Sequence, residues 1–579
     1  MKDRTSRRLN FRQSYCLIRS SLAIVVIFAY ATSLPIAAQS AEPVYDIVIR
    51  NGRVLDGAGN PWIAADIAIK DGRFARIGKI SGKGKREIDA RGKYVSPGWI
   101  DVMDQSGSVL RRNGLAENKL LMGVTTAIGG EGGTPVTVDR IPEYFAELEK
   151  SGISINFGTY FSETQARVAV LGQDSRAPTP EELARMKAIM ESAMKAGVIG
   201  MTTALIYPPS SYAKTEELIE MAKVAGQYGG IYASHIRGEG KELIEAVEEA
   251  ITIGEKSGLP VEVFHLKAAH QPGWGTLMRG AGEKIEQARA RGVDVAADIY
   301  LYTAGGTGLE AVIPSWAFEG GAAKLLERLK DPETRARFKK EMTTGSPGWW
   351  NIVEASGGWE NVVLANARNK DNARFEGKSL AEIGKEWNKD PADAAFDLVM
   401  QGNGRVYALY HMMSEQDIKT ALKFPWTSIG SDAGAALTPG TVDSQGLPHP
   451  RSYGNHARLI AKYVREGGVI SLPEAIRKMT SWPATRMRIA ERGLIKEGLW
   501  ADVVIFDYDK IQDRATYQEP LLSPVGIDHV LVNGKVVIEQ GKHTGARPGK
   551  VIYGPGRTVG MPPPSPTVSA NQERPASKL

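Results

Sequence analysis

The sequence predicts an α/β protein in which a (β/α)8 barrel is joined to a small β-sandwich domain built from both ends of the chain. Two patterns support this fold class. Residues 97–490 alternate short apolar strands with amphipathic helices, which is typical of a parallel sheet with right-handed crossovers. Residues 42–96 and 491–553 instead contain short alternating runs separated by turns. Neither end has enough strands for a core of its own, so we expect the two ends to pair.

Composition places the chain among ordinary globular proteins. Of its 579 residues, 42% are hydrophobic and 24% are charged. The formal net charge of +6 is concentrated in residues 1–41, which carry +5 and leave the remainder nearly neutral. A nearly neutral body offers no basic surface for a phosphate backbone, so no nucleic-acid partner is expected.

Residues 1–41 have the pattern of an export signal. A basic stretch precedes an apolar run that starts at Ser21, and small residues follow at 37–41. We expect cleavage near Ala41, export to the periplasm or the extracellular space, and no stable membrane span afterwards. An uncleaved anchor helix is the alternative, although the apolar run is short for a full span. The single cysteine, Cys16, lies in this segment, so the expected mature chain has no disulfide and no thiolate ligand.

The two sandwich segments share one texture. Alternating runs begin at Tyr45, Ile63 and Arg73 near the N-terminus, and at Asp502 and Val530 near the C-terminus. Turn signals between these runs are Asn51-Gly52, Asp71-Gly72, Arg91-Gly92 and Asn533-Gly534. Residues 554–579 are rich in Pro and Ser and are expected to be disordered.

The middle of the chain contains nine strand candidates, one more than a closed barrel needs, and the pattern does not say which lies outside. They are Gly98–Met103, Val124–Gly129, Ile153–Tyr160, Val198–Ala204, Gly230–His235, Val261–His265, Val293–Ile299, Val406–Tyr410 and Trp426–Ser431. The rhythm breaks at about 313–375, where Trp, Gly and Lys accumulate. That stretch predicts an inserted subdomain or lid.

Two histidines close consecutive strand candidates. His235 ends one strand, a helix over about Lys241–Lys256 follows, and His265 ends the next strand. In a parallel barrel the carboxyl ends of neighbouring strands meet on the active-site rim. Two imidazoles at adjacent strand ends favour a divalent metal site. The alternative is two unrelated histidines in loops or in the core.

Two carboxylates also follow strand candidates. Glu131 lies among glycines after Val124–Gly129, where the backbone can adopt unusual conformations, and it is a candidate third ligand or base. Asp432 directly follows the strand candidate Trp426–Ser431 and is a candidate acceptor for a proton from water. The alternatives are a solvated loop glutamate for Glu131 and a helix N-cap for Asp432.

Further polar residues lie on the same expected rim. Lys267, Arg237, Tyr207 and Tyr302 follow strand candidates, and cations and phenols there suit a substrate carboxylate. Each of them taken singly also fits a surface or packing residue. Tyr300 shares the rim, whereas His411, His449 and Arg451 come from later loops and carry weaker signals.

Together these residues resemble the amidohydrolase superfamily, in the branch of the D-aminoacylases (N-acyl-D-amino-acid deacylases). The matching strings are Asp46-Ile-Val-Ile-Arg-Asn-Gly, Val95-Ser-Pro-Gly-Trp-Ile-Asp, Gly123-Val-Thr-Thr, Leu205-Ile-Tyr-Pro-Pro, Ser234-His-Ile-Arg, His265-Leu-Lys, Asp298-Ile-Tyr, Gly430-Ser-Asp, His449-Pro-Arg-Ser-Tyr-Gly, Glu474-Ala-Ile-Arg-Lys-Met-Thr and Gly498-Leu-Trp-Ala-Asp-Val-Val-Ile-Phe-Asp. The resemblance implies a (β/α)8 barrel of the TIM type with a small β-sandwich.

The chain departs from this family at the first barrel strand. Family members have Asp-x-His-x-His there, whereas Met103 and Gln105 replace both histidines here. The resemblance implies one divalent metal, Zn²⁺ first, held by His235, His265 and Glu131, with Glu131 in place of a cysteine. A carboxylate for a thiolate makes Mn²⁺ or Fe²⁺ more plausible. The second metal site of the family is not expected to form.

The resemblance also implies roles for the remaining site residues. Asp432 matches the catalytic aspartate, and Lys267 and Tyr302, with Tyr207 nearby, match the grip on the substrate carboxylate. The expected activity is hydrolysis of a linear amide C–N bond in an N-acyl-D-amino acid or a related dipeptide.

Two alternatives stay open. One is an exported protein that binds such a ligand on a degenerate barrel without catalysis, which the missing His-x-His motif favours. The other is a hydrolase for a cyclic amide, an L-configured dipeptide or an aryl amide. The sequence predicts no oligomeric state.

Overall fold

The computed structural model describes residues 44–436 and 446–557, and every structural statement below concerns these residues. The expected signal peptide at 1–41 lies outside them, as do residues 558–579 of the expected tail at 554–579. Within the described ranges, no helix has both the length and the apolar character needed to cross a membrane.

The two ends of the chain form one sheet. Strand β5 from the N-terminal segment pairs antiparallel with β18 from the C-terminal segment, with Ser96 opposite Val504. The alternate side chains of both strands are apolar and buried, so pairing the two ends covers a core that neither covers alone. In the described part of the chain this nine-stranded sheet contains β1 (Tyr45–Val54), β2 (Ile63–Lys70), β3 (Arg73–Gly78), β4 (Gly84–Asp89), β5 (Tyr94–Pro97), β18 (Val503–Phe506), β19 (Ile527–Val532), β20 (Lys535–Glu539) and β21 (Lys542–His543).

Three of the expected turns connect strands of this sheet, and Arg91-Gly92 lies between β4 and β5. Asp71-Gly72 joins β2 to β3 and Asn533-Gly534 joins β19 to β20, with positive φ at all four residues. Two successive positive φ angles characterise the type I′ hairpin turn, which favours Asn-Gly and Asp-Gly. The expectation for Asn51-Gly52 was wrong. It lies inside β1, at a shift of register opposite β2, because a positive φ at Asn51 forms a bulge there.

The middle of the chain provides two parallel sheets. One has the order β6-β7-β8 and the other the order β17-β13-β12-β11-β10-β9. Their bounds are β6 (Trp99–Asp104), β7 (Val124–Gly129), β8 (Asn156–Thr159), β9 (Phe161–Ser162), β10 (Gly200–Ala204), β11 (Ile231–His235), β12 (Val261–Val263), β13 (Val295–Ile299) and β17 (Thr427–Ile429). Backbone bonds join the two sheets at both edges: the Ile199 amide donates to the Thr159 carbonyl (2.9 Å), and the Asp432 amide donates to the Met103 carbonyl (2.8 Å).

Amphipathic helices connect the parallel strands. Helix α5 begins with a capping box in which Thr179 and Glu182 satisfy each other's backbone amides. Helix α7 was expected over Lys241–Lys256 and runs from Leu243 to Ser257, with its apolar side buried. The helices of this part are α1 (Gly107–Leu110), α2 (Glu117–Leu121), α3 (Ile141–Ser151), α4 (Glu163–Leu171), α5 (Pro180–Ala196), α6 (Thr215–Gln227), α7 (Leu243–Ser257), α8 (Leu277–Ala290), α14 (Glu415–Lys423), α15 (Arg451–Arg458), α16 (Leu472–Met479) and α17 (Ser481–Arg486), with a π-helix over Leu459–Glu466.

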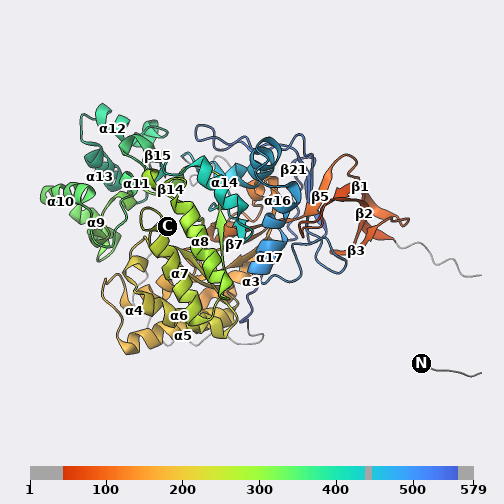
Figure 1. Cartoon of the computed structure of the whole chain (residues 1–579), viewed down its shortest axis with the longest axis horizontal. Coiled ribbons are helices and arrows are strands. Elements are labelled where there is room, and N and C mark those ends of the chain that lie inside the picture. The colour runs from red at the N-terminus through yellow and green to blue at the C-terminus, as the bar shows by residue number, and fades with distance from the viewer. Residues whose placement is uncertain (1–43, 437–445, 558–579) are drawn as a thin grey trace, which may run out of the picture. The chain divides into compact units, whose positions relative to one another are not determined.

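A separate antiparallel sheet interrupts this pattern. Its order is β14-β16-β15, and the strand candidate Val406–Tyr410 forms β16 there. The strands are β14 (Gly305–Gly308), β15 (Val362–Asn366) and β16 (Tyr407–Tyr410), and the helices are α9 (Ala322–Arg328), α10 (Pro332–Thr344), α11 (Ile352–Ala355), α12 (Leu380–Glu386) and α13 (Pro391–Gln401). Figure 1 shows these elements grouped together, and they enclose an apolar core of their own. The stretch at about 313–375 lies within this segment.

Candidate metal centre and catalytic site

Three side chains from separate strand ends converge on one point. His235 Nδ1 lies 2.9 Å from Glu131 Oε1, and His265 Nε2 lies 3.2 Å from the same oxygen. One ligand atom from each residue falls within 4.8 Å of the other two. Both histidines are almost completely buried, and the Glu131 side chain is 15% exposed. The donor set of two imidazoles and one carboxylate is one that Zn²⁺ accepts.

Backbone conformation aims these side chains. Gly130 precedes Glu131 with a φ of +101°, and a Cβ there would come within 2.8 Å of the Tyr160 carbonyl oxygen. Only glycine therefore fits at this turn. His265 follows β12 with a φ of +36°, a conformation that side chains other than glycine rarely adopt. The predicted strand Val261–His265 accordingly ends at Val263.

The electrostatics of the cluster favour a cation. Burial raises the pKa of Glu131, but hydrogen bonds from His235 and His265 outweigh it and hold that pKa well below its ordinary value. Burial and the Lys267 ammonium lower the pKa of His265, but Glu239 and Glu131 outweigh them and raise it to about 9. The carboxylates thus stabilise positive charge at the centre of the cluster.

Glu239 belongs to this cluster, although the sequence interpretation missed it. It is 2% exposed, and its Oε1 lies 3.2 Å from His265 Nδ1 and close to Lys267 Nζ. The Lys267 Nζ also lies 2.7 Å from His265 Nδ1. Glu239 follows His235 at i+4, in the loop after strand β11, and that spacing was the only sequence signal for it. Lys267 is therefore adjacent to the cluster, with Glu239 as its counter-ion.

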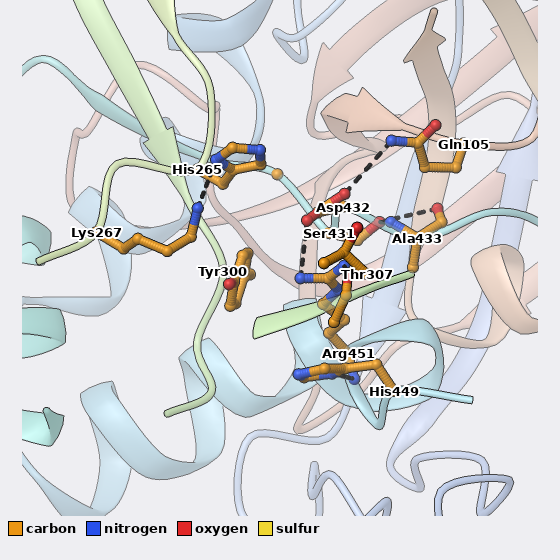
Figure 2. A network of polar contacts seen from close by, with 12 residues as sticks. Gln105, His265, Lys267, Tyr300, Thr307, Ser431, Asp432, Ala433, His449 and Arg451 are labelled. Atoms are coloured by element: carbon orange, nitrogen blue, oxygen red, sulfur yellow. Dashed lines mark hydrogen bonds and ion pairs between the residues drawn. The ribbon is translucent and has the colours of Figure 1, made fainter. Parts of the chain in front are cut away.

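Asp432 lies beside the cluster and links it to an arginine. Its Oδ2 lies 2.8 Å from Arg451 Nη1, and Gln105 Nε2 donates to its Oδ1 at 3.4 Å. The same Gln105 amide nitrogen donates to Glu131 Oε2 at 2.8 Å. Figure 2 shows Gln105, Asp432 and Arg451 as one chain of polar contacts. A neutral amide thus bridges the two carboxylates at the position where the resemblance implied a histidine.

The sequence interpretation also gave too little importance to Arg451. It is 3% exposed, and its guanidinium lies 4.5 Å from the centre of the Tyr300 ring. Its Nε forms no hydrogen bond with any residue that the structure describes. His449 holds the backbone here: its Nε2 donates to the Ala304 carbonyl (2.8 Å), and its Nδ1 accepts from the Arg451 amide (3.0 Å). A buried guanidinium with a free donor is suited to an anion.

Tyr207 lies at the cluster, as expected from its strand end. Its ring centre lies 5.3 Å from that of His235, and its hydroxyl is 2.8 Å from the Thr307 hydroxyl of β14. The antiparallel sheet therefore contributes to the surroundings of the site.

Two expected substrate-binding residues do not face the cluster. Arg237 directs its donors to Glu249 and to the carbonyls of Ser211 and Ala213, so its guanidinium is fully used within the fold. Tyr302 packs against Tyr517, with Arg458 over its ring at 4.4 Å.

Tyr300 instead approaches the site. Its ring centre lies 6.4 Å from that of His265. The regular strand ends at Ile299, and residues 301–303 bend, so the alternation of the strand does not extend to Tyr302.

The comparisons with known proteins identify the family of this chain. A family model described as "Amidohydrolase family" matches residues 394–538. The N-acyl-D-glutamate deacylase of Alcaligenes xylosoxydans xylosoxydans is 30% identical, over 89% of this chain and 98% of its own length. The D-aminoacylase of the same organism is 30% identical, over 89% of this chain and 99% of its own length.

A solved structure gives the same result. The N-acyl-D-glutamate deacylase from Bordetella bronchiseptica, crystallised with zinc and a phosphonate inhibitor, superposes with a TM-score of 0.73 at 30% identity. The match covers 88% of this chain and all of that one. The resemblance drawn from the sequence motifs is thereby confirmed: the chain belongs to the amidohydrolases, in the family of the D-aminoacylases and N-acyl-D-amino-acid deacylases.

Proposed function

We propose that this protein is a metal-dependent hydrolase that removes the acyl group from N-acyl-D-amino acids. The observation that carries the proposal is the convergence of Glu131, His235 and His265 beside the Asp432–Arg451 ion pair. Relatives that this chain matches over nearly their whole length are named as deacylases and aminoacylases of this substrate class. Nothing among the described residues favours the non-catalytic alternative.

Glu131, His235 and His265 would hold one divalent cation, with Zn²⁺ as our first choice because the related deacylase contains zinc. When bound, the ion supplies Lewis-acid polarisation of the scissile carbonyl. Met103 and Gln105 offer no imidazole for a second ion, and Gln105 already bridges Glu131 and Asp432. This supports a single metal per chain.

The chain's own residues account for the proton movements and for binding. Asp432 accepts the proton of the attacking water and delivers it to the leaving nitrogen. The Nε of Arg451 has no hydrogen-bond partner among the described residues, and the guanidinium carbon lies 4.5 Å from the centre of the Tyr300 ring. These features support Arg451 as the ligand of the substrate carboxylate. Lys267, beside the Nδ1 of His265, contributes a second positive charge. Tyr207, whose ring packs against His235, forms part of the wall of the site.

We further propose that the two parallel sheets close into a (β/α)8 barrel and that the nine-stranded sheet belongs to the small sandwich domain. The hydrogen bonds at Ile199 and Asp432, which join the sheets at both edges, support closure. The proposed layout is a signal peptide at 1–41, sandwich segments at 42–96 and 491–553, a barrel at 97–490 with its insertion at about 313–375, and a tail at 554–579. The basic and apolar character of residues 1–41 supports export to the periplasm or beyond.

An Asp432→Asn variant tests the function. We expect purified wild-type protein to hydrolyse N-acetyl-D-amino acids and not the L-enantiomers, and Asp432→Asn to bind the same amount of metal with turnover lowered at least 100-fold. Asp513→Asn is the matched control. Like Asp432, Asp513 pairs with an arginine of helix α15, in this case Arg458, but it lies away from the metal cluster. Retained turnover in Asp432→Asn removes Asp432 from the reaction, and binding of the D-substrate without turnover in wild type supports the non-catalytic alternative.

A further inference from the structure

A buried lysine is hydrogen-bonded to the residues on both sides of Asp432. Lys119, on the short helix α2, has no exposed side-chain surface. Its Nζ lies 2.9 Å from Asp101 Oδ2 and 2.7 Å from Asp104 Oδ2. Burying an ammonium is costly unless charges and hydrogen bonds compensate, and the two carboxylates of β6 do so. Lys119, Asp101 and Asp104 thus form a charged group, the Lys119 cluster, that is separate from the metal-site residues described above.

The same ammonium reaches across to the segment that contains Asp432. It donates to the Ser431 hydroxyl at 2.8 Å and to the Ala433 carbonyl. Asp101 adds a third bond, because its Oδ1 accepts from the Ser431 amide at 2.8 Å. The residues on both sides of Asp432 are thus bonded to one charged cluster, and Figure 2 shows Ser431 and Ala433 flanking Asp432.

Asp432 needs this support because its backbone is strained. Its φ is +48°, in the left-handed region that residues other than glycine rarely occupy. Such a conformation persists only where the surroundings over-determine it. Its own amide donates to the Met103 carbonyl of β6 at 2.8 Å, so all three residues 431–433 are bonded to β6 or to Lys119.

The left-handed turn is what presents the carboxylate. It directs the Asp432 side chain toward Arg451 and Gln105, while the neighbours on both sides bind the Lys119 cluster. A relaxed backbone would rotate the carboxylate away from both partners, because φ sets the direction of the Cα–Cβ bond. The contacts of Lys119, together with the Asp101 bond to the Ser431 amide and the Asp432 amide bond to Met103, hold the turn in this conformation.

We propose that Lys119 is a positioning residue for Asp432, holding the backbone of residues 431–433 in the conformation that the reaction uses. This inference rests on the proposed function, in which Asp432 moves a proton. Lys119 forms none of its described contacts with the metal ligands or with Arg451, so we expect its removal to affect turnover more than metal content or substrate binding.

The experiment compares two buried lysines. Lys119→Met removes the ammonium with little change in length, and Lys478→Met is the matched control. Lys478 is also fully buried and donates to the carbonyls of Phe424 and Thr427, at the opposite end of strand β17 from Asp432. Both variants lose a buried lysine bonded to the same strand segment, but only one loses contact with the neighbours of Asp432.

We expect Lys119→Met to lower kcat at least tenfold, with KM within twofold of wild type and the metal content unchanged. Lys478→Met is expected to lower Tm while leaving kcat within twofold. Ser431→Ala removes one acceptor of the Lys119 ammonium and serves where Lys119→Met does not fold, and for it we expect a threefold or larger loss of kcat at unchanged KM.

A kcat within twofold of wild type in Lys119→Met overturns the inference, as does the same result in Ser431→Ala if Lys119→Met yields no folded protein. An equal loss of kcat in Lys478→Met also overturns it, because a general structural effect then explains both. Asp432→Asn separates the two levels: if that variant is inactive while Lys119→Met is fully active, the positioning role fails and the proposed function stands. If Asp432→Asn is active, the proposed function itself fails.

Discussion

His456 makes stability depend on pH through a single buried imidazole. Its side chain is fully buried, and its ring stacks on Trp99 with centres 6.4 Å apart. Burial lowers the pKa of His456 to about 4, although Asp101 partly opposes this shift. In the unfolded chain a histidine has a pKa of about 6.5, so below that pH the unfolded state takes up a proton that the folded state refuses.

The magnitude follows from this difference. Stability from His456 is fully present above pH 6.5 and is lost as the pH falls toward 4. Each pH unit in that window costs about 1.4 kcal/mol, so the loss between pH 8 and pH 5 is about 2 kcal/mol. His456→Phe removes the titrating group and keeps a ring against Trp99, so this part of the pH dependence disappears in the variant.

The assay is urea unfolding of wild type and His456→Phe at several pH values from 8 to 5. The difference at pH 8 measures the packing cost of the substitution, because His456 is neutral in both states there. We expect the free energy of unfolding of wild type to fall by about 2 kcal/mol more than that of the variant by pH 5. A difference that stays constant within about 0.5 kcal/mol refutes the argument, and one that grows in favour of wild type indicates a protonated His456 in the folded protein.

Three further outcomes are expected. Arg451→Met is predicted to raise KM at least tenfold with unchanged metal content, because a charged hydrogen bond contributes about 1.5–3 kcal/mol; an unchanged KM, measured by initial rates, rules Arg451 out as the carboxylate ligand. His235→Ala is predicted to lose its divalent ion on dialysis, read by elemental analysis, and full retention contradicts the three-ligand centre. Gly123→Ala is predicted to destabilise the fold by about 2 kcal/mol or more, because its Cβ at a φ of +86° would lie 2.4 Å from the Trp99 ring. Gly92→Ala, with a similar φ and open space, is the control for backbone strain alone, and equal losses of Tm in both variants contradict the steric argument.

The positions of His235 and His265 could be predicted from sequence because the reasoning is local. Apolar runs and Gly-Leu-Pro turns locate consecutive strands, and parallel strands bring their carboxyl ends to the same edge. Strand ends were less well predicted. The left-handed backbone at His265 and Asp432 ends β12 and β17 early, and it depends on contacts from other parts of the chain.

Local sequence patterns were enough to predict that the chain ends pair, that alternating strands and helices lie between them, and that Glu131, His235, His265 and Asp432 follow strands. Periodicity, turn residues and motif spacing are local properties and are readable without coordinates. Which charges are used within the fold and which remain for a ligand depends on contacts between distant parts of the chain. The guanidinium of Arg237 pairs with Glu249, whereas the Nε of Arg451 has no hydrogen-bond partner among the described residues. Ion pairs and hydrogen bonds form between whichever groups packing brings within a few ångström, and the hydrogen-bonded Lys119 and Ser431 are 312 positions apart in the chain.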